Sequence, residues 1–392
     1  MENIFSDRIS DVPRSFIREI LKVTIDSSVI SFAGGLPSRK LFPLKELQAA
    51  ANKVFDEDGY DSLQYSTSEG DQELREWIAD RYRRTKDLTV QADDILITSG
   101  SQQGLDLLGK TFVNEDDPVI IEEPGYLGAI QALSLCKPRF FPVPLSADGI
   151  GLDAFEQAVR KHPVKLFYCV PNFQNPSGIS YSEENRQAIG KILKGKKTIL
   201  VEDDPYSELR FLGRMQPSFR RIIPENTVLL GSFSKIVVPS FRIGWVAARK
   251  DILDKLIIAK QASDLHSNYF CQRVISRYLK ENDIDAHIAV IRDVYGKQRD
   301  AMIQAIREFF PSEAGYTQPE GGMFLWVTLP RHLSAMDVFE KAIGQKVVFV
   351  PGDPFYVGKK NVNTMRLNFS CMDEETIREG IKRLGNVLKG LM

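Results

Sequence analysis

Short apolar runs alternate with amphipathic segments along most of the chain. Several of the runs are apolar at nearly every position, namely residues 94–100, 118–124, 164–171, 198–204, 227–234 and 242–249. A strand with one buried face alternates apolar and polar residues, whereas a strand buried on both faces is apolar throughout. The runs therefore predict strands at the centre of a largely parallel sheet.

The segments between these runs have the period of amphipathic helices. Residues 73–84, 101–112, 125–133 and 183–193 are the clearest cases. In residues 101–112, for example, Leu105, Leu108 and Phe112 fall on one face. Strands that alternate with helices predict an α/β fold in which helices cover a mostly parallel sheet.

The pattern changes at about residue 280 and suggests three parts. A long charged helix (287–310) precedes a strand within residues 319–330, a helix and a strand at 364–370. We expect a small α+β domain over residues 281–392 and a large domain over residues 46–280. Residues 1–45 hold a short helical pattern (15–24) and a Gly- and Pro-rich stretch, which predict an N-terminal arm that packs with the small domain.

Composition narrows the classes of function. The formal net charge is −1, and the basic clusters RYRRTK and KILKGKK read as solvated helix faces, so no nucleic-acid partner is expected. The N-terminus has no apolar signal segment, and no run reaches the roughly 18 apolar residues that span a bilayer. Four dispersed cysteines and four dispersed histidines predict neither a disulfide framework nor a metal site. We expect a cytoplasmic protein with no membrane partner.

Polar side chains collect at the ends of the predicted strands. Ligands of open α/β sheets bind beyond the carboxyl ends of the strands. The candidate residues at these ends are Ser101, Gln102, Tyr126, Asn175, Asp203, Tyr206, Ser232, Ser234, Lys235, Arg242 and, later in the chain, Arg366.

This set of residues suits an aromatic aldehyde cofactor that carries a phosphate. The sequence has no Walker loop, GxGxxG motif or GxSxG motif that would indicate a nucleotide site or a serine nucleophile instead. Pyridoxal 5′-phosphate needs an amine for a Schiff base, which Lys235 supplies. Asp203 would keep the ring nitrogen protonated, because only a carboxylate balances that charge. Asn175 and Tyr206 would donate to the phenolate oxygen, and Tyr126 would stack on the ring.

The remaining candidates suit the phosphate. Ser101 and Gln102 open a predicted helix, where free N–H groups and the positive end of the helix dipole favour an anion. Ser232 and Ser234 would add hydroxyl donors, and Arg242 a charge-assisted contact.

Each candidate taken alone also has a purely structural explanation. Asp203 and Asn175 are typical turn residues, Tyr126 and Tyr206 typical packing residues, Ser101 a typical helix N-cap, and Lys235 an ordinary lysine at the edge of an apolar run. Their order and their shared place at the strand ends favour the cofactor site.

Nine motifs give the chain a clear resemblance to a known family. They lie at residues 31–43, 63–78, 97–108, 122–126, 170–178, 201–211, 231–245, 319–327 and 365–370. The chain resembles the class I/II aminotransferases of fold type I, and within them the α-aminoadipate/kynurenine aminotransferase group. The resemblance implies a seven-stranded-type sheet and transfer of an amino group between an L-amino acid and a 2-oxo acid, with glutamate and 2-oxoglutarate as the expected pair.

The resemblance also implies roles for single residues. Lys235 of SFSK would carry the cofactor as an internal aldimine, and Asp203 of DDPY would meet the ring nitrogen. Arg366 of MRLNFS would take the substrate α-carboxylate, beside Asn175 of NPSG.

Further roles concern the N-terminal part of the chain. Tyr65 would reach the phosphate of a neighbouring subunit, which implies a homodimer with shared sites. Gly34 and Gly35 would lie beside the substrate. Arg18, in the helical part of the arm, would bear on the choice of substrate side chain.

Two other functions stay open. The same fold supports other pyridoxal-phosphate reactions, such as C–S lysis, decarboxylation or cyclopropane formation, although Arg366 counts against decarboxylation. A transcription regulator with an aminotransferase-like domain would need roughly 100 more residues for a winged helix and linker, whereas about 30 precede the motif at residues 31–43. The amino acid also stays open among 2-aminoadipate, branched-chain, aromatic and methionine-like types; Phe355 and Tyr356 suggest a tolerant pocket.

Overall fold

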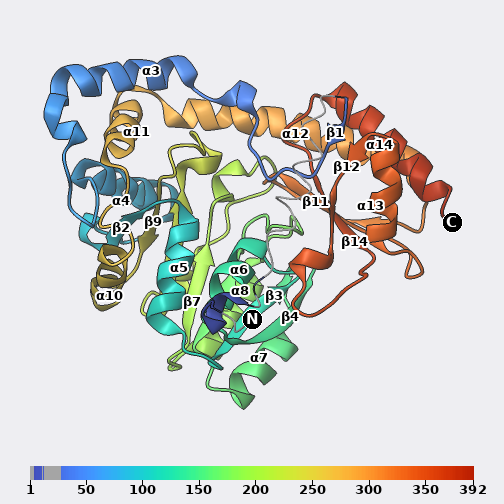
Figure 1. Cartoon of the computed structure of the whole chain (residues 1–392), viewed down its shortest axis with the longest axis horizontal. Coiled ribbons are helices and arrows are strands. Elements are labelled where there is room, and N and C mark those ends of the chain that lie inside the picture. Colours follow the sequence, from blue (N-terminus) through green and yellow to red (C-terminus); the bar gives the residue numbers. More distant parts are fainter. Residues whose placement is uncertain (1–3, 11, 13–27) are drawn as a thin grey trace.

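The largest sheet lies at the centre of the molecule (Figure 1). The computed structural model describes residues 4–10, 12 and 28–392, and within them this sheet has eight strands. In spatial order they are β2 (Ile95–Thr98), β9 (Gly244–Ala247), β8 (Thr227–Ser232), β7 (Ile199–Asp203), β6 (Leu166–Cys169), β3 (Pro118–Glu123), β4 (Arg139–Ser146) and β5 (Gly149–Ile150).

The central strands are parallel, as predicted. Strands β8, β7, β6, β3 and β4 run in one direction, whereas β9 is antiparallel to both of its neighbours. Strand β5 is a two-residue edge strand that pairs antiparallel with β4, beyond the seven longer strands. The apolar runs did not reveal β4, because Pro142 and Pro144 interrupt it and it lies towards the edge of the sheet.

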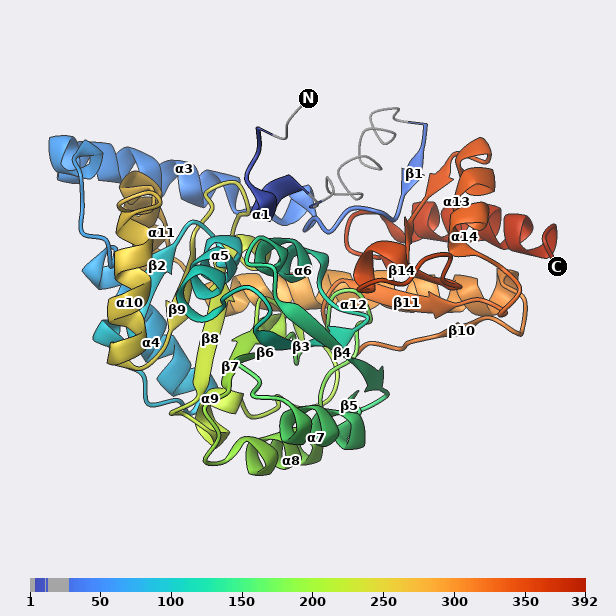
Figure 2. The same cartoon turned by 60° about the horizontal axis from the view of Figure 1, so that its bottom comes forward.

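Helices cover both faces of this sheet (Figure 2). Helices α5 (Ser101–Phe112) and α6 (Leu127–Ser134) lie on one face, and α7 (Leu152–Lys161), α8 (Glu183–Leu193) and α9 (Phe219–Ile222) lie on the other. Consecutive residues of β3 pack on opposite faces of the sheet. Ile121 belongs to the core that contains Leu105 and Leu108 of α5. Ile120 belongs to the core that contains Phe155 of α7. Both faces are therefore apolar, which explains the continuous runs.

A second, antiparallel sheet has the order β10 (Gly315–Tyr316), β11 (Phe324–Thr328), β14 (Thr364–Asn368) and β13 (Val350–Pro351). The long helix α12 (Ile284–Phe309) reaches it from the side of the large sheet and packs on α14 (Glu374–Lys389) (Figure 1). Strand β1 (Ile30–Ser31) pairs with β12 (Val347–Val348), so an N-terminal segment lies beside a C-terminal one. The division of the chain at residues 45 and 280 stays a prediction.

The other α-helices of the described residues are α1 (Asp7–Ser10), α3 (Leu44–Lys53), α4 (Gln72–Lys86), α10 (Lys250–Gln261), α11 (Tyr269–Glu281) and α13 (Ala335–Gly344). The helix predicted at residues 15–24 lies outside the described residues. Within the described ranges, no helix is long and apolar enough to cross a bilayer.

Gly244 lets three elements meet at one point. A Cβ atom on Gly244 would lie 2.8 Å from the Gly100 carbonyl carbon, the Gly231 oxygen and the Ser101 nitrogen. These are backbone atoms of the turn before α5 and of β8, so none of them can move alone. The close contact of β9 with β8 and with the start of α5 therefore requires glycine.

We expect Gly244→Ala to lower the free energy of unfolding by about 1–3 kcal/mol, the usual cost of overpacking. Gly296→Ala in α12 is the control, because its Cβ would have its nearest contact at 3.7 Å, with the Phe211 side chain, and alanine favours a helix. The thermal unfolding midpoint should fall for Gly244→Ala only; equal midpoints for the two variants would refute this account of the contact.

Candidate active site

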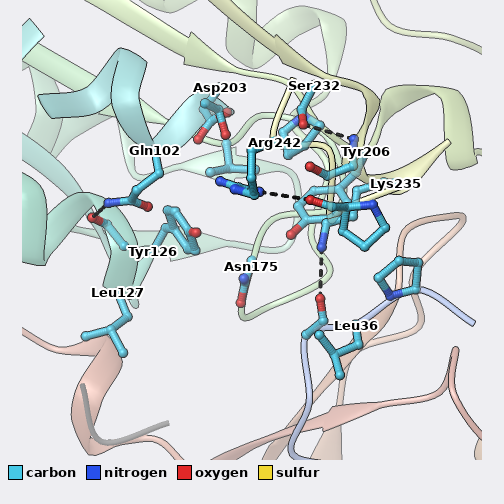
Figure 3. A pocket seen from close by; sticks show the side chains of 18 of the residues that line it. Leu36, Gln102, Tyr126, Leu127, Asn175, Asp203, Tyr206, Ser232, Lys235 and Arg242 are labelled. Carbon is cyan, nitrogen blue, oxygen red and sulfur yellow. Dashed lines mark hydrogen bonds between the residues drawn. The ribbon is translucent and has the colours of Figure 1, made fainter. Parts of the chain in front are cut away.

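A cavity of about 930 Å³ opens at the carboxyl ends of the central strands (Figure 3). Its walls come from β7 and β8, from the first residues of α5 and α6, from the loop at residues 35–37 and from β14. Most of the residues chosen from the sequence line it: Gly35, Ser101, Gln102, Tyr126, Asn175, Asp203, Tyr206, Ser232, Ser234, Lys235, Arg242 and Arg366. The structure thus gathers side chains that are far apart in the sequence.

Lys235 ends a single helical turn that follows β8. Ser232 caps this turn, since its hydroxyl accepts a hydrogen bond of 3.1 Å from the Ser234 N–H. The Lys235 ammonium donates to the Gly35 carbonyl at 2.8 Å (Figure 3). Burial, together with the nearby guanidinium groups of Arg366 and Arg242, lowers the pKa of Lys235 to about 8. About a tenth of this amine is therefore neutral, and nucleophilic, at pH 7, and about half at pH 8.

Asp203 is the last residue of β7 and is 2% exposed. The Tyr168 hydroxyl donates to its Oδ2 at 2.8 Å, and its Oδ1 has no hydrogen-bond partner in the described structure. Burial raises the pKa of Asp203 to about 7, and the hydrogen bond from Tyr168 opposes this rise. A buried carboxylate with one free oxygen on a cavity wall is suited to a cationic N–H donor.

Arg366 lies in the middle of β14 and is 1% exposed. Its Nη1 donates to Asn175 Oδ1 at 2.8 Å and its Nη2 to the Ala33 carbonyl at 2.7 Å, and both acceptors are neutral. Burial lowers the pKa of Arg366 to about 10. The Phe324 ring lies 4.4 Å from the guanidinium carbon. A buried guanidinium with neutral acceptors on these two nitrogens is prepared to bind an anion such as a carboxylate.

The start of α5 forms another wall of the cavity, beside the side chain of Arg242. Gly100 has a φ of +77° and is the N-cap, so Ser101 is the first helical residue and not the N-cap that its residue type alone suggests. A side chain on Gly100 would collide with the guanidinium of Arg242, which itself has a φ of +56°. The first N–H groups of a helix lack intrahelical acceptors. Together with Ser232 and Ser234 they form a set of donors suited to a phosphate.

Glu122 and Gln174, which the sequence patterns did not single out, connect two walls of the cavity. The buried Glu122 carboxylate accepts hydrogen bonds from the Val170 N–H, the Tyr181 hydroxyl and the Gln174 side chain. Gln174 also donates to the Pro124 carbonyl at 2.8 Å, which joins the turn before Tyr126 to the turn that carries Asn175. The available signal was an acidic residue inside an apolar run, since such residues are rarely buried without partners.

Some predicted residues lie elsewhere. Tyr65 is outside the set of lining residues and is 79% exposed, with its ring 5.7 Å from that of His266. Phe355 supports the Arg366 guanidinium at 5.3 Å instead of lining the described cavity, so it gives no evidence of a tolerant pocket. Gly34 precedes the lining residue Gly35, and Arg18 lies outside the described residues.

Other lining residues were not chosen from the sequence: Leu36, Pro37, Leu127, Gly128, Gln131, Val170, Pro205 and Pro239. Within the described part of the chain, no cluster of three or more His, Cys, Asp or Glu side chains could hold a metal ion.

We expect Tyr168→Phe to raise the pKa of Asp203. The hydroxyl of Tyr168 stabilises the ionised carboxylate, and a hydrogen bond to a charged group contributes about 1.5–3 kcal/mol, or about 1–2 pKa units. Infrared titration of the protonated carboxyl band, assigned by its loss in Asp203→Asn, measures this. Tyr181→Phe is the control, because its hydroxyl donates to Glu122. An unchanged pKa in Tyr168→Phe would contradict the assignment.

Comparison with known proteins assigns the chain to a family. Residues 29–384 match the family model for aminotransferase class I and II. Aromatic-amino-acid aminotransferase 1 of Thermococcus litoralis is 40% identical, over 99% of this chain and 94% of the relative. The 2-aminoadipate transaminase of Thermus thermophilus is 40% identical, over 97% of this chain and 95% of the relative.

A crystal structure supports the same assignment. The α-aminoadipate aminotransferase of Thermus thermophilus, complexed with N-(5′-phosphopyridoxyl)-L-leucine, superposes with a TM-score of 0.92 at 39% identity and covers 99% of this chain and 97% of that one. The likeness therefore covers nearly the whole chain. The chain therefore belongs to the class I and II aminotransferases, the fold-type I enzymes that depend on pyridoxal 5′-phosphate.

Proposed function

We propose that this cavity holds pyridoxal 5′-phosphate through Lys235 and transfers an amino group between an L-amino acid and a 2-oxo acid. The observation that carries the proposal is that one cavity gathers three largely buried ionisable side chains without an oppositely charged partner in the described structure. Lys235 has a lowered pKa, Asp203 has an oxygen without a partner, and Arg366 has its two terminal nitrogens on neutral acceptors.

The residues fit the cofactor. The free oxygen of Asp203 would accept a hydrogen bond from the protonated ring nitrogen, and Tyr126 on the wall would cover the ring. The phosphate would bind at the start of α5, beside Arg242, Ser232 and Ser234. A cavity of about 930 Å³ also lies within the usual range for small-molecule sites.

When bound, the cofactor supplies an electron sink that stabilises negative charge at the substrate α-carbon. The protein supplies the proton transfer and the positioning. Lys235 in its neutral form accepts the proton from the α-carbon and later returns a proton. The positive charge of the ring nitrogen would lower the pKa of Asp203, so that the carboxylate would be ionised and would keep this nitrogen protonated. Asn175 uses its amide oxygen to orient Arg366, which leaves its NH₂ group to donate.

Arg366 would bind the α-carboxylate in a bidentate contact. Gly35 lies beside this group, since a Cβ there would be in ordinary contact with the Phe324 ring at 3.6 Å and with Arg366 Nη1 at 4.0 Å. Retention of the α-carboxylate favours transamination over decarboxylation. C–S lysis and related reactions on the same fold remain the alternative function.

For the substrates we propose 2-oxoglutarate and glutamate as one pair. The second pair comes from the similar proteins, which are named for aromatic amino acids and for 2-aminoadipate. Branched-chain and methionine-like amino acids belong to the same test panel.

We also propose a homodimer in which Tyr65 reaches the partner's phosphate site. Tyr65 belongs to an exposed apolar stretch with Phe55, Tyr60 and Leu63, which are 52%, 93% and 64% exposed. Such a stretch is typical of an interface. A cytoplasmic location is part of the proposal, and the free thiols of Cys136, Cys169, Cys271 and Cys371 suit a reducing compartment.

We expect Lys235→Ala to lose at least about 10³-fold in transaminase turnover, because no other group replaces its proton transfer. The measurement is the absorbance change of the loaded protein on addition of each amino acid in the panel. Lys255→Ala, at an exposed position of α10, is the control and should react like the wild type. Full turnover by Lys235→Ala would refute the mechanism.

A second prediction concerns Arg366→Lys. An ammonium keeps the charge but cannot form the two parallel hydrogen bonds, so KM for both the amino acid and the 2-oxo acid should rise by about 10-fold or more. Affinity for the cofactor should change little. A rise in KM for one substrate only would contradict a shared α-carboxylate site.

A further inference from the structure

Lys260 is fully buried near the end of α10, and the cofactor cavity does not use it. Its side chain is 0% exposed. Its ammonium lies 2.8 Å from Asp264 Oδ1 and donates to Gln103 Oε1 at 2.9 Å and to the Ser267 hydroxyl at 3.0 Å. Burial of a lysine is costly, and an apolar side chain of similar length would avoid the cost.

The partners of Lys260 hold the turn between β2 and α5 from both sides. Before Gly100, the Ser99 N–H donates to Gln103 Oε1 at 2.8 Å and the Ser99 hydroxyl to Asp264 Oδ2 at 3.1 Å. After Gly100, the Gln103 amide donates to Asp264 Oδ2 at 2.7 Å. Lys260 binds the two acceptors, Gln103 and Asp264, on which these contacts depend.

This turn carries the residues that the proposed function assigns to the phosphate. Gly100 and Ser101 lie between the two clamped positions, and Gly100 also packs against the Arg242 guanidinium. Ser99 and Gln103 therefore help to set the direction of the first N–H groups of α5. An anion binds well only when the donor N–H groups point towards it, so a small rotation of this turn would weaken phosphate binding.

We propose that Lys260 and Asp264 are positioning residues that fix the phosphate-binding turn from behind, without touching the cofactor. The inference rests on the proposed function. Their effect is confined to the phosphate end, because the contacts that hold Lys235, Asp203 and Arg366 come from other elements.

The same helix offers a matched control. Lys250 and Asp254 form an ion pair of 3.0 Å with the same four-residue spacing as Lys260 and Asp264, but the Lys250 side chain is 82% exposed. Lys260→Met and Lys250→Met thus remove the same charge from the same helix, and only the first reaches the turn.

The test compares two ligands on the full-length protein after removal of the cofactor. Pyridoxal 5′-phosphate and pyridoxal differ only in the phosphate, and absorbance titration gives the dissociation constant of each. We expect Lys260→Met to raise the constant for pyridoxal 5′-phosphate by about 10-fold, equal to about 1.4 kcal/mol, and to leave that for pyridoxal within about 2-fold. Lys250→Met should change neither. Ser99→Ala, which removes one hydroxyl from the turn, should give the same selective loss in smaller measure and serves if Lys260→Met folds poorly.

Unchanged binding of pyridoxal 5′-phosphate by Lys260→Met and by Ser99→Ala would overturn the inference while the proposed function stood. Equal losses for both ligands would also overturn it, because they would show a general structural effect. A wild-type protein that binds neither ligand would contradict the proposed function itself, and this inference with it.

Discussion

The site depends on the hydrogen bond between a largely buried lysine amine and a backbone carbonyl, close to two arginine side chains. Lys235 donates to the Gly35 carbonyl, which is neutral, and the charges of Arg366 and Arg242 disfavour a third positive charge nearby. Burial acts in the same direction. The amine is therefore available in its neutral form about two pH units below the usual range for lysine, and this availability is what covalent attachment and proton transfer at carbon require.

Two other buried charged groups of the cavity lack an oppositely charged partner within the described part of the chain. Asp203 keeps one buried oxygen without a partner, and Arg366 keeps a buried guanidinium on neutral acceptors. Each lies on a separate element, so the fold and not local sequence fixes the distance between them. Such groups reduce stability unless a ligand completes them. Binding of a cofactor and of a substrate carboxylate would therefore offset the cost of these buried groups. Arg242, held at a positive φ, shows the same compromise at the phosphate end.

Much of this arrangement could be predicted from the sequence, and the reason is geometric. Parallel strands end at one edge of a sheet, so polar residues just after apolar runs had to converge. The failures have physical causes as well. Strand β4 was not predicted, because two prolines interrupt its apolar pattern; its position towards the edge of the sheet tolerates them. Tyr168, Glu122 and Lys260 escaped notice because their partners, such as Asp203, Gln174 and Gln103, are distant in sequence, and hydrophobic patterns record burial but not the identity of a partner. The helix predicted over residues 101–112 is α5, and only the alternative explanation of Ser101 as its N-cap was wrong, because Gly100 takes that position.

The most direct test of the central claim is to locate the lysine that binds the cofactor. The protein is incubated with pyridoxal 5′-phosphate near pH 8, reduced with borohydride, digested and analysed by peptide mass spectrometry. We predict one phosphopyridoxyl group per chain, on Lys235, because this amine has a lowered pKa and lines the cavity. A label spread over exposed lysines, or absent from Lys235, would contradict it.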